Sequence, residues 1–472
     1  MERRWKILLV VSVGAFMAFL DAPVVSIAFP ALQETFRATP ATTLGWTIDA
    51  YFIGFAAVLV VGGKLSDRYG RRRVFMTGMW LFLGASLVCG LAPTAGVLIA
   101  ARAAQAVAAA LVVPSGQALM LIEFEPHERR KAIGILAGLV AVATSLAPTV
   151  GAVIVEGPGW RWIFYLNVFV GAGVIAWAAR LMHRDRPDAG APTPDALGSV
   201  IEAAALSFLV LGILKSQQWG LGDPRTLAAL AAGVAGFALF IDRCRRHRAP
   251  VLDLRMFRNR PFTVANLSSI AFAIALYAGT INSVLYLTSV WGLSILTTGL
   301  IFAPAALVSV VVGGVMGRLA DRYDPRPITA GGALVAAIGL VLIATSTGLQ
   351  EDYVGGWLPG QVVYTVGIVT GLTGVIGTAL TSVPTAQLAL ASGINAAMRQ
   401  VGGAVGVAFT LAILGDSFGA EAMRRGHTVF LIGAGALLVA GFVALFMQPV
   451  PVAATEPGLV PSPAEELPNA GG

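Results

Sequence analysis

The sequence predicts an all-helical membrane protein that crosses the bilayer fourteen times. Apolar residues make up 57% of the 472 residues and charged residues only 12%, whereas soluble proteins hold roughly 45–50% and about 25%. Long uncharged runs recur along the whole chain, and about 20 apolar residues span a bilayer as a helix. These runs are apolar on all sides, which excludes the alternating strands of a membrane β-barrel.

The first apolar run follows Glu2-Arg3-Arg4-Trp5-Lys6 and continues nearly unbroken from Ile7 to Leu32. This length is too great for the core of a signal peptide, so we expect an uncleaved first helix. In chain order, the predicted spans are residues 7–31, 43–62, 74–92, 96–121, 133–155, 162–181, 197–215, 225–242, 262–289, 295–316, 327–346, 357–382, 394–415 and 428–447.

The basic residues indicate which loops between the predicted spans lie on the cytoplasmic side. With the N-terminus inside, 24 of the 32 lysines and arginines fall in cytoplasmic segments, and two, Arg102 and Arg399, fall inside spans. This asymmetry is the positive-inside bias of cell-membrane proteins, and it places both termini in the cytoplasm. The six basic residues assigned to outer segments are Arg37, Arg161, Lys215, Arg225, Arg424 and Arg425.

An internal repeat divides the chain. The heptapeptide from Gly63 to Tyr69 returns from Gly317 to Tyr323 with five identities, and both copies are expected in short cytoplasmic turns, after the second and tenth spans. This arrangement indicates two parallel six-helix halves separated by two extra helices. We expect an N-terminal half at 1–186, a two-helix insert at 187–260, a C-terminal half at 261–448 and a disordered cytoplasmic tail at 449–472.

The motifs resemble those of the major facilitator superfamily, and within it the fourteen-helix drug:proton antiporters, over about residues 5–448. Residues 63–73 look like the family's loop signature, Arg102-Ala103-Ala104-Gln105 is similar to its span-4 motif, and residues 147–152 represent its antiporter signature. Three further stretches resemble the fourteen-helix branch: residues 20–25, residues 160–167, and Ser392-Gly393-Ile394-Asn395 with Arg399-Gln400. The resemblance implies the major facilitator fold, antibiotic efflux and a monomer.

Two acidic residues lie deep in the predicted spans. Asp21 lies fifteen residues after Lys6, and Asp49 lies fifteen residues before Lys64 on the antiparallel neighbour. At about 1.5 Å per residue, both carboxyl groups are about 22 Å from the cytoplasmic end. Because a charge at this depth is costly, we expect both to face a central cavity.

Burial favours a protonated carboxyl group and a nearby cation favours the ionised one, so these acids could exchange a proton for a cationic solute. By resemblance, Arg102 is linked to proton coupling. The structural alternative is that Arg102 permanently pairs with Asp21 or Asp49 and only ties helices together.

Asp67 can accept hydrogen bonds from a helix N-terminus or from Arg71, and such contacts would hold one conformation closed. The resemblance implies this gating role for a set that also includes the second copy of the repeat: Gly63, Asp67, Arg68, Gly70, Arg71, Asp321 and Arg322. The alternative, that the arginines only anchor the loop, leaves Asp67 unexplained.

Several other residues are weaker candidates. Pro148 and Gly151 permit bending and close helix contact in the antiporter span. Trp46 and Tyr51 flank Asp49 and could contact a lipophilic cation, or could anchor the helix at the interface. The remaining cavity candidates, Gln105, Asn395 and Arg399, could equally bond neighbouring helices.

The sequence also narrows the chemistry. The two cysteines do not suggest a disulfide framework, and all four histidines are expected in loops. No ATP-binding, metal-ligand or hydrolase motif is present, so we expect no enzyme activity, cofactor or bound metal. The basic pI reflects membrane topology rather than nucleic-acid binding.

The favoured hypothesis is a proton-coupled antiporter that exports amphipathic or cationic drug-like compounds across the cell membrane by alternating access. An alternative with the same fold is a carrier of a specific metabolite or lipid, coupled to protons or sodium ions. A third hypothesis, a membrane scaffold or sensor without transport, is disfavoured because no extra globular domain is predicted.

Overall fold

The computed structural model describes residues 2–125, 128–182, 195–220, 222–248, 250–414 and 419–447, and within these ranges it is helical with no strand. Fourteen helices of 21 or more residues are present in the described part: α1 (Arg3–Ile27), α4 (Trp46–Tyr69), α5 (Arg71–Leu91), α6 (Ala95–Glu123), α7 (Arg129–Glu156), α8 (Arg161–Leu181), α9 (Ala196–Trp219), α10 (Pro224–Arg246), α11 (Arg260–Ser289), α12 (Ile295–Arg322), α13 (Pro325–Ser346), α14 (Leu358–Thr381), α15 (Leu388–Leu414) and α16 (Gly419–Ala444).

Twelve of these helices are long and apolar enough to cross a membrane, by length and composition within the described residues. The other two, α1 and α7, have 25 and 28 residues. The chain is therefore a multi-pass membrane protein, while the count of fourteen crossings stays a prediction. The short elements are α2 (Phe29–Thr35), α3 (Ala41–Leu44), η2 (Leu254–Arg258), η3 (Tyr353–Trp357) and η4 (Thr385–Gln387).

The ends of several helices follow from local side-chain chemistry. Thr94 and Ser294 cap α6 and α12 by accepting hydrogen bonds from backbone N–H groups of the first turn. Asp223 and Asp324 cap α10 and α13, each just before a proline that needs no N–H partner there. These caps explain why four predicted spans begin within two residues of the observed helices.

Gly70 makes the reversal between α4 and α5. Its φ of 98° lies in the region that favours glycine, so α5 begins at the very next residue. The prediction that both heptapeptide copies form turns was wrong, because α4 continues to Tyr69 and α12 to Arg322. The helices therefore extend past the apolar runs that defined the spans.

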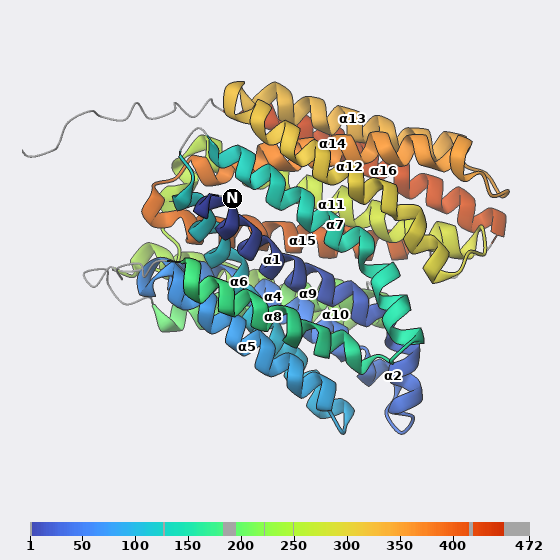
Figure 1. Ribbon diagram of the computed structural model, residues 1–472, viewed down its shortest axis with the longest axis horizontal. Coiled ribbons are helices and arrows are strands. Elements are labelled where there is room, and N and C mark those ends of the chain that lie inside the picture. The colour runs from blue at the N-terminus through green and yellow to red at the C-terminus, as the bar shows by residue number, and fades with distance from the viewer. Residues whose placement is uncertain are drawn as a thin grey trace, which may run out of the picture.

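The long helices lie side by side, with α13, α14 and α16 in the upper part of Figure 1 and α5, α6 and α8 in the lower part. We call α1 and α4 to α8 the N-terminal set, and α11 to α16 the C-terminal set. The two sets meet where α4 packs on α15 and α7 packs on α12. Of the remaining long helices, α9 packs on α10 and also contacts α4 and α15.

Close helix contact between the two sets depends on glycine. A Cβ atom at Gly63 would collide with the Ala389 carbonyl, and one at Gly393 would collide with the Leu59 carbonyl. These contacts bring α4 and α15 together near the start of α15. At the second contact, between α7 and α12, the glycines are Gly138 and Gly313.

We call this end of the bundle, which holds Gly70 and the start of α15, the basic end, because Arg71, Arg72 and Arg73 follow Gly70. Figure 1 shows the N-terminus of the chain at the left, where α5 also begins.

Two predictions about single residues need correction, and others fall on residues that the structure does not describe. Lys215 was assigned to an outer segment, but it is buried in α9, which continues to Trp219. His427 was expected in a loop, but it lies in α16 and contacts the hydroxyl groups of Tyr286 and Thr347. The side chains of Asp321 and Arg322 and the tail at 449–472 are outside the described residues.

Candidate functional site

A buried ion pair lies in the middle of the N-terminal set. Nη1 of Arg102 on α6 donates to Oδ2 of Asp21 on α1, and neither side chain has accessible surface. Such a pair is stable inside a protein only when further hydrogen bonds satisfy its remaining atoms. The surroundings of both residues supply these bonds.

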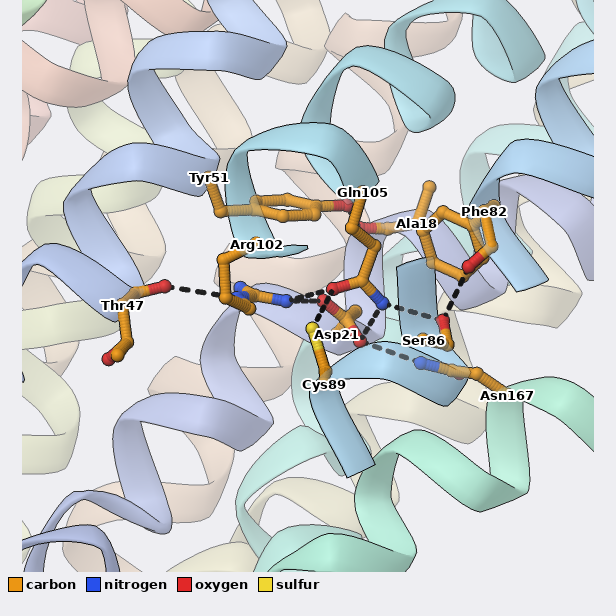
Figure 2. Close-up of polar contacts among 10 residues, drawn as sticks. All are labelled: Ala18, Asp21, Thr47, Tyr51, Phe82, Ser86, Cys89, Arg102, Gln105 and Asn167. Atoms are coloured by element: carbon orange, nitrogen blue, oxygen red, sulfur yellow. Dashed lines mark hydrogen bonds and ion pairs between the residues drawn. The ribbon is translucent and has the colours of Figure 1, made fainter. Parts of the chain in front are cut away.

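The second carboxylate oxygen of Asp21 is held by two amide groups. Asn167 on α8 donates to Oδ1 over 2.7 Å, and Gln105 on α6 donates to the same oxygen over 3.1 Å. The Gln105 amide also donates to the Ser86 hydroxyl on α5 over 2.8 Å. Figure 2 shows these side chains converging on Asp21.

Arg102 is positioned by α4 as well. Its Nε donates to the Thr47 carbonyl over 3.0 Å, and Nη1 also donates to Gln105 Oε1 over 2.7 Å. The Tyr51 side chain lies beside Arg102 in Figure 2, and its hydroxyl donates to the Ala18 carbonyl. The guanidinium carbon is 4.3 Å from the centroid of the Tyr51 ring. Nη2 has no hydrogen-bond partner among the described residues, so one strong donor of this buried cation is not used by the protein.

The structure brings together Asp21, Arg102, Gln105 and Tyr51 of the predicted candidates. Tyr51 was considered as a partner for a solute, and it instead covers the arginine. Sequence reasoning missed Asn167, Ser86 and Thr47, although Asn167 ends one of the stretches that carried the family resemblance. A single amide in an apolar run could have indicated it, because such groups need a partner inside the membrane.

Asp49 does not join this site. Its Oδ2 forms an ion pair with Nζ of Lys215 on α9 over 2.5 Å, and the Trp46 ring lies 4.9 Å from the same nitrogen. Lys215 is 2% exposed and Asp49 is 17% exposed. Of the two pairings considered for Arg102, the structure has the one with Asp21, whereas Asp49 pairs with Lys215.

Asp67 links the two sets at the basic end. Its carboxylate accepts hydrogen bonds from the backbone N–H groups of Leu390 at 2.9 Å and Ala389 at 3.3 Å, in the first turn of α15. Arg71 forms an ion pair with the same carboxylate over 3.4 Å and donates to the Thr385 carbonyl. Both partners named from the sequence, a helix N-terminus and Arg71, are therefore in contact with Asp67.

A second bond between the sets lies nearby. The Ser392 hydroxyl on α15 donates to Gln117 Oε1 on α6, and both side chains are buried. Together with the Asp67 contacts and the glycine contacts of α4 and α15, this bond joins the two sets at the basic end.

The helix α7, which carries the predicted antiporter signature, packs on α1. A Cβ atom at Gly151 would stand 3.2 Å from Ile27 and 3.4 Å from Val24 of α1, so a larger residue would crowd the helix that carries Asp21. The Pro148 side chain lies outside the described residues.

The C-terminal set contains a separate polar cluster. Arg399 on α15 donates to Asn395 Oδ1, whose amide donates to Ser269 over 2.9 Å and to Asn266 over 3.1 Å, both on α11. The predicted cavity residues Asn395 and Arg399 are thus in contact with each other. In the described part of the chain, no group of three His, Cys, Asp or Glu side chains is placed to hold a metal ion.

Comparison with known protein families shows the family to which this chain belongs. Residues 11–407 match the model described as Major Facilitator Superfamily. The chain belongs to this superfamily. It is therefore a membrane transport protein and not an enzyme.

Other proteins of the superfamily are similar over most of their length. The tetracenomycin C resistance and export protein of Streptomyces glaucescens is 31% identical over 86% of this chain and 75% of the relative. The multidrug resistance protein Stp of Mycobacterium tuberculosis is 32% identical, with the same coverage of each chain. A crystal structure of the human organic anion transporter MFSD10 has the same fold, with a TM-score of 0.64, 14% identity, and coverage of 94% of this chain and 100% of that one.

Proposed function

We propose that this chain is a proton-coupled antiporter that exports amphipathic or cationic compounds, including antibiotics. The observation that carries the proposal is the buried pair of Asp21 and Arg102, in which a carboxylate deep in the helix bundle faces a cation with an unused donor. The resistance and export functions in the names of the relatives support the substrate class and the direction of transport.

Protonation of Asp21 is the proposed coupling step. An ionised Asp21 holds Arg102, and with it the contacts from α6 to the Thr47 carbonyl on α4. A neutral Asp21 no longer attracts the guanidinium, so Arg102 is free to move and the equilibrium between two conformations shifts. Because α1, α4, α6 and α8 all contribute to this network, one proton changes the packing of four helices.

The contacts of Asp67 serve as the gate in this proposal. We place the basic end in the cytoplasm, because basic segments are retained there. The present conformation is then closed toward the cytoplasm, and opening it requires breaking the bonds from Asp67 to Leu390 and Ala389 and from Ser392 to Gln117. The two sets would move against each other as the two halves of a monomer.

Asp49 is proposed as a second proton-sensitive group with a different partner. Its carboxylate is partly exposed, and Lys215 neutralises it from α9. Protonating Asp49 would release Lys215 and loosen the contact of α9 with α4. The insert would then respond to protons together with the N-terminal set.

The proposal is tested with ethidium, a fluorescent lipophilic cation, in proteoliposomes under an imposed pH gradient. We expect native protein to move ethidium against its gradient, and Asp21→Asn to lose most of this transport. Asp242→Asn is the matched control, since Asp242 is 47% exposed and its ion pair with Arg246 lies one helical turn along α10. Gradient-driven transport that survives in Asp21→Asn would show that Asp21 does not couple protons to the solute.

A further inference from the structure

Arg399 is a cation in the body of α15 without an ionic partner among the described residues. Its one hydrogen bond goes to the neutral amide of Asn395. Arginine carries five N–H donors and does not lose its charge in proteins. The side chain therefore brings a full positive charge into the helix bundle, and no acidic side chain among the described residues neutralises it.

The other charges inside the bundle do not neutralise Arg399. Arg102 pairs with Asp21, and Lys215 pairs with Asp49. Glu202 on α9 is buried, and neither of its carboxyl oxygens has a hydrogen-bond partner in the described part of the chain. Between residues 260 and 414 the sequence holds four acidic residues, all beyond or at the ends of the long helices: Asp321, Asp324, Glu351 and Asp352.

Arg399 lies on the face of α15 that packs on α11. Its side chain is partly exposed, whereas Asn395 and Gly403, one turn before and one turn after it on the same helix face, are buried. The Tyr277 ring packs on Gly403, and its hydroxyl donates to Gln400 over 3.2 Å. This face of α15 thus packs on α11, and Arg399 keeps part of its side-chain surface accessible there.

We propose that Arg399 binds the anionic group, a carboxylate or a comparable organic anion, of the solutes that this chain transports. An arginine within a membrane-spanning segment is costly, and such charges commonly mark sites that bind a solute or an ion. The planar guanidinium offers two parallel hydrogen bonds to a carboxylate, with an aromatic ring and an amide from Tyr277 and Gln400 nearby. The inference rests on the proposed transport function and applies to those of its amphipathic substrates that carry an acidic group.

The test uses radiolabelled salicylate and its neutral analogue salicylamide as probes of purified protein in detergent. We expect native protein to bind salicylate at least about tenfold more tightly than salicylamide, which corresponds to a single strong charged contact. Arg399→Gln should lose this preference, and Arg399→Lys should keep part of it. Arg246→Gln, which removes a surface arginine with 79% exposure, should bind both probes as the native protein does.

Two outcomes would overturn the proposal: no preference for salicylate in the native protein, or an unchanged preference in Arg399→Gln. A third arm raises the chloride concentration tenfold. Salicylate binding should stay within about threefold, whereas its displacement would assign the site to an inorganic ion and contradict a role in solute recognition.

Thermal unfolding separates this role from a structural one. Arg399→Gln removes no ionic contact with the described residues, so this variant should unfold at the same Tm as native protein or a higher one. A Tm that falls as far as that of Arg102→Gln would show that Arg399 stabilises the fold and would contradict the proposal. Because these measurements need no proton gradient, they can fail or succeed independently of proton-coupled transport.

Discussion

Asp21 and Arg102 stabilise each other only as a pair. The Asp21 carboxylate accepts bonds from Arg102, Gln105 and Asn167, and it has no contact with solvent. Removing one member of such a pair leaves a buried charge without compensation, which costs more than the complete pair contributes. Each residue of the pair thus compensates the buried charge of the other.

Arg102→Gln should therefore destabilise the folded protein by roughly 3–5 kcal/mol, since it leaves the Asp21 carboxylate buried and unpaired. Adding Asp21→Asn should recover much of this loss. Thermal or denaturant unfolding of the two single variants and the double variant measures the coupling between them. Effects that simply add would show that the two side chains do not act as a pair.

Among the elements, the insert helices α9 and α10 are joined by a bidentate ion pair. Arg243 at the end of α10 donates to both carboxylate oxygens of Asp195, over 2.5 and 2.7 Å, just before α9 begins. These bonds from Arg243 lower the pKa of Asp195 below its ordinary value. The pair fixes the two helices at the basic end, while Lys215 fixes α9 to α4 farther along.

This pKa shift predicts a pH dependence. Because the pKa of Asp195 is lower in the folded protein, the pair stabilises the fold at pH values above the pKa of Asp in the unfolded chain, about 3.9. This contribution is lost as the pH falls through the pKa of Asp195 in the folded protein. Asp195→Asn should lower Tm at pH 6 to 7, and the difference from native protein should shrink below about pH 4. A difference that stays constant from pH 7 to pH 3 would contradict an ionised pair.

In the proposed mechanism, the contact between α4 and α15 keeps the basic end closed. In Gly393→Ala the added Cβ would collide with the Leu59 carbonyl, so α15 must move away from α4. Spin labels at Tyr69 and Thr385, both exposed at this end, should report a longer distance by double electron–electron resonance, once Cys89 and Cys244 are replaced. In Gly84→Ala, where the added Cβ meets nothing within 4 Å, the distance should not change. An unchanged distance in Gly393→Ala would show that this contact does not keep the end closed.

At the scale of the whole molecule, the sequence predicts the helices far better than the contacts between them. The apolar runs place the fourteen long helices in the correct order. A helix in lipid makes its backbone hydrogen bonds within itself and has mostly apolar side chains, so each one is visible as a run of high hydropathy. The exact ends of the helices are harder to predict from the sequence. Polar residues such as Lys64 and Lys215 mark the edge of an apolar run, yet both helices continue beyond them.

Side-chain partners depend on tertiary packing, and this limits what the sequence predicts about the site. Asp21 and Arg102 were recognisable because charges inside apolar runs are rare. The counter-ion of Asp49 was not, since Lys215 is 166 positions away and stands where a helix was expected to end. The hydrogen bonds of Asp67 were predicted by type, but their place at α15 required the packing of α4 on α15.

The central claim is that a proton on Asp21 drives the transport cycle, and comparing two transport modes of Asp21→Asn tests it most directly. Ethidium uptake driven by a pH gradient requires protonation and deprotonation, whereas exchange of labelled for unlabelled ethidium requires only movement of the loaded carrier. We predict that Asp21→Asn loses gradient-driven uptake and retains exchange at a rate within about tenfold of native protein. If Asp21→Asn keeps gradient-driven uptake, or loses both modes to the same extent while remaining folded, Asp21 is not the coupling group.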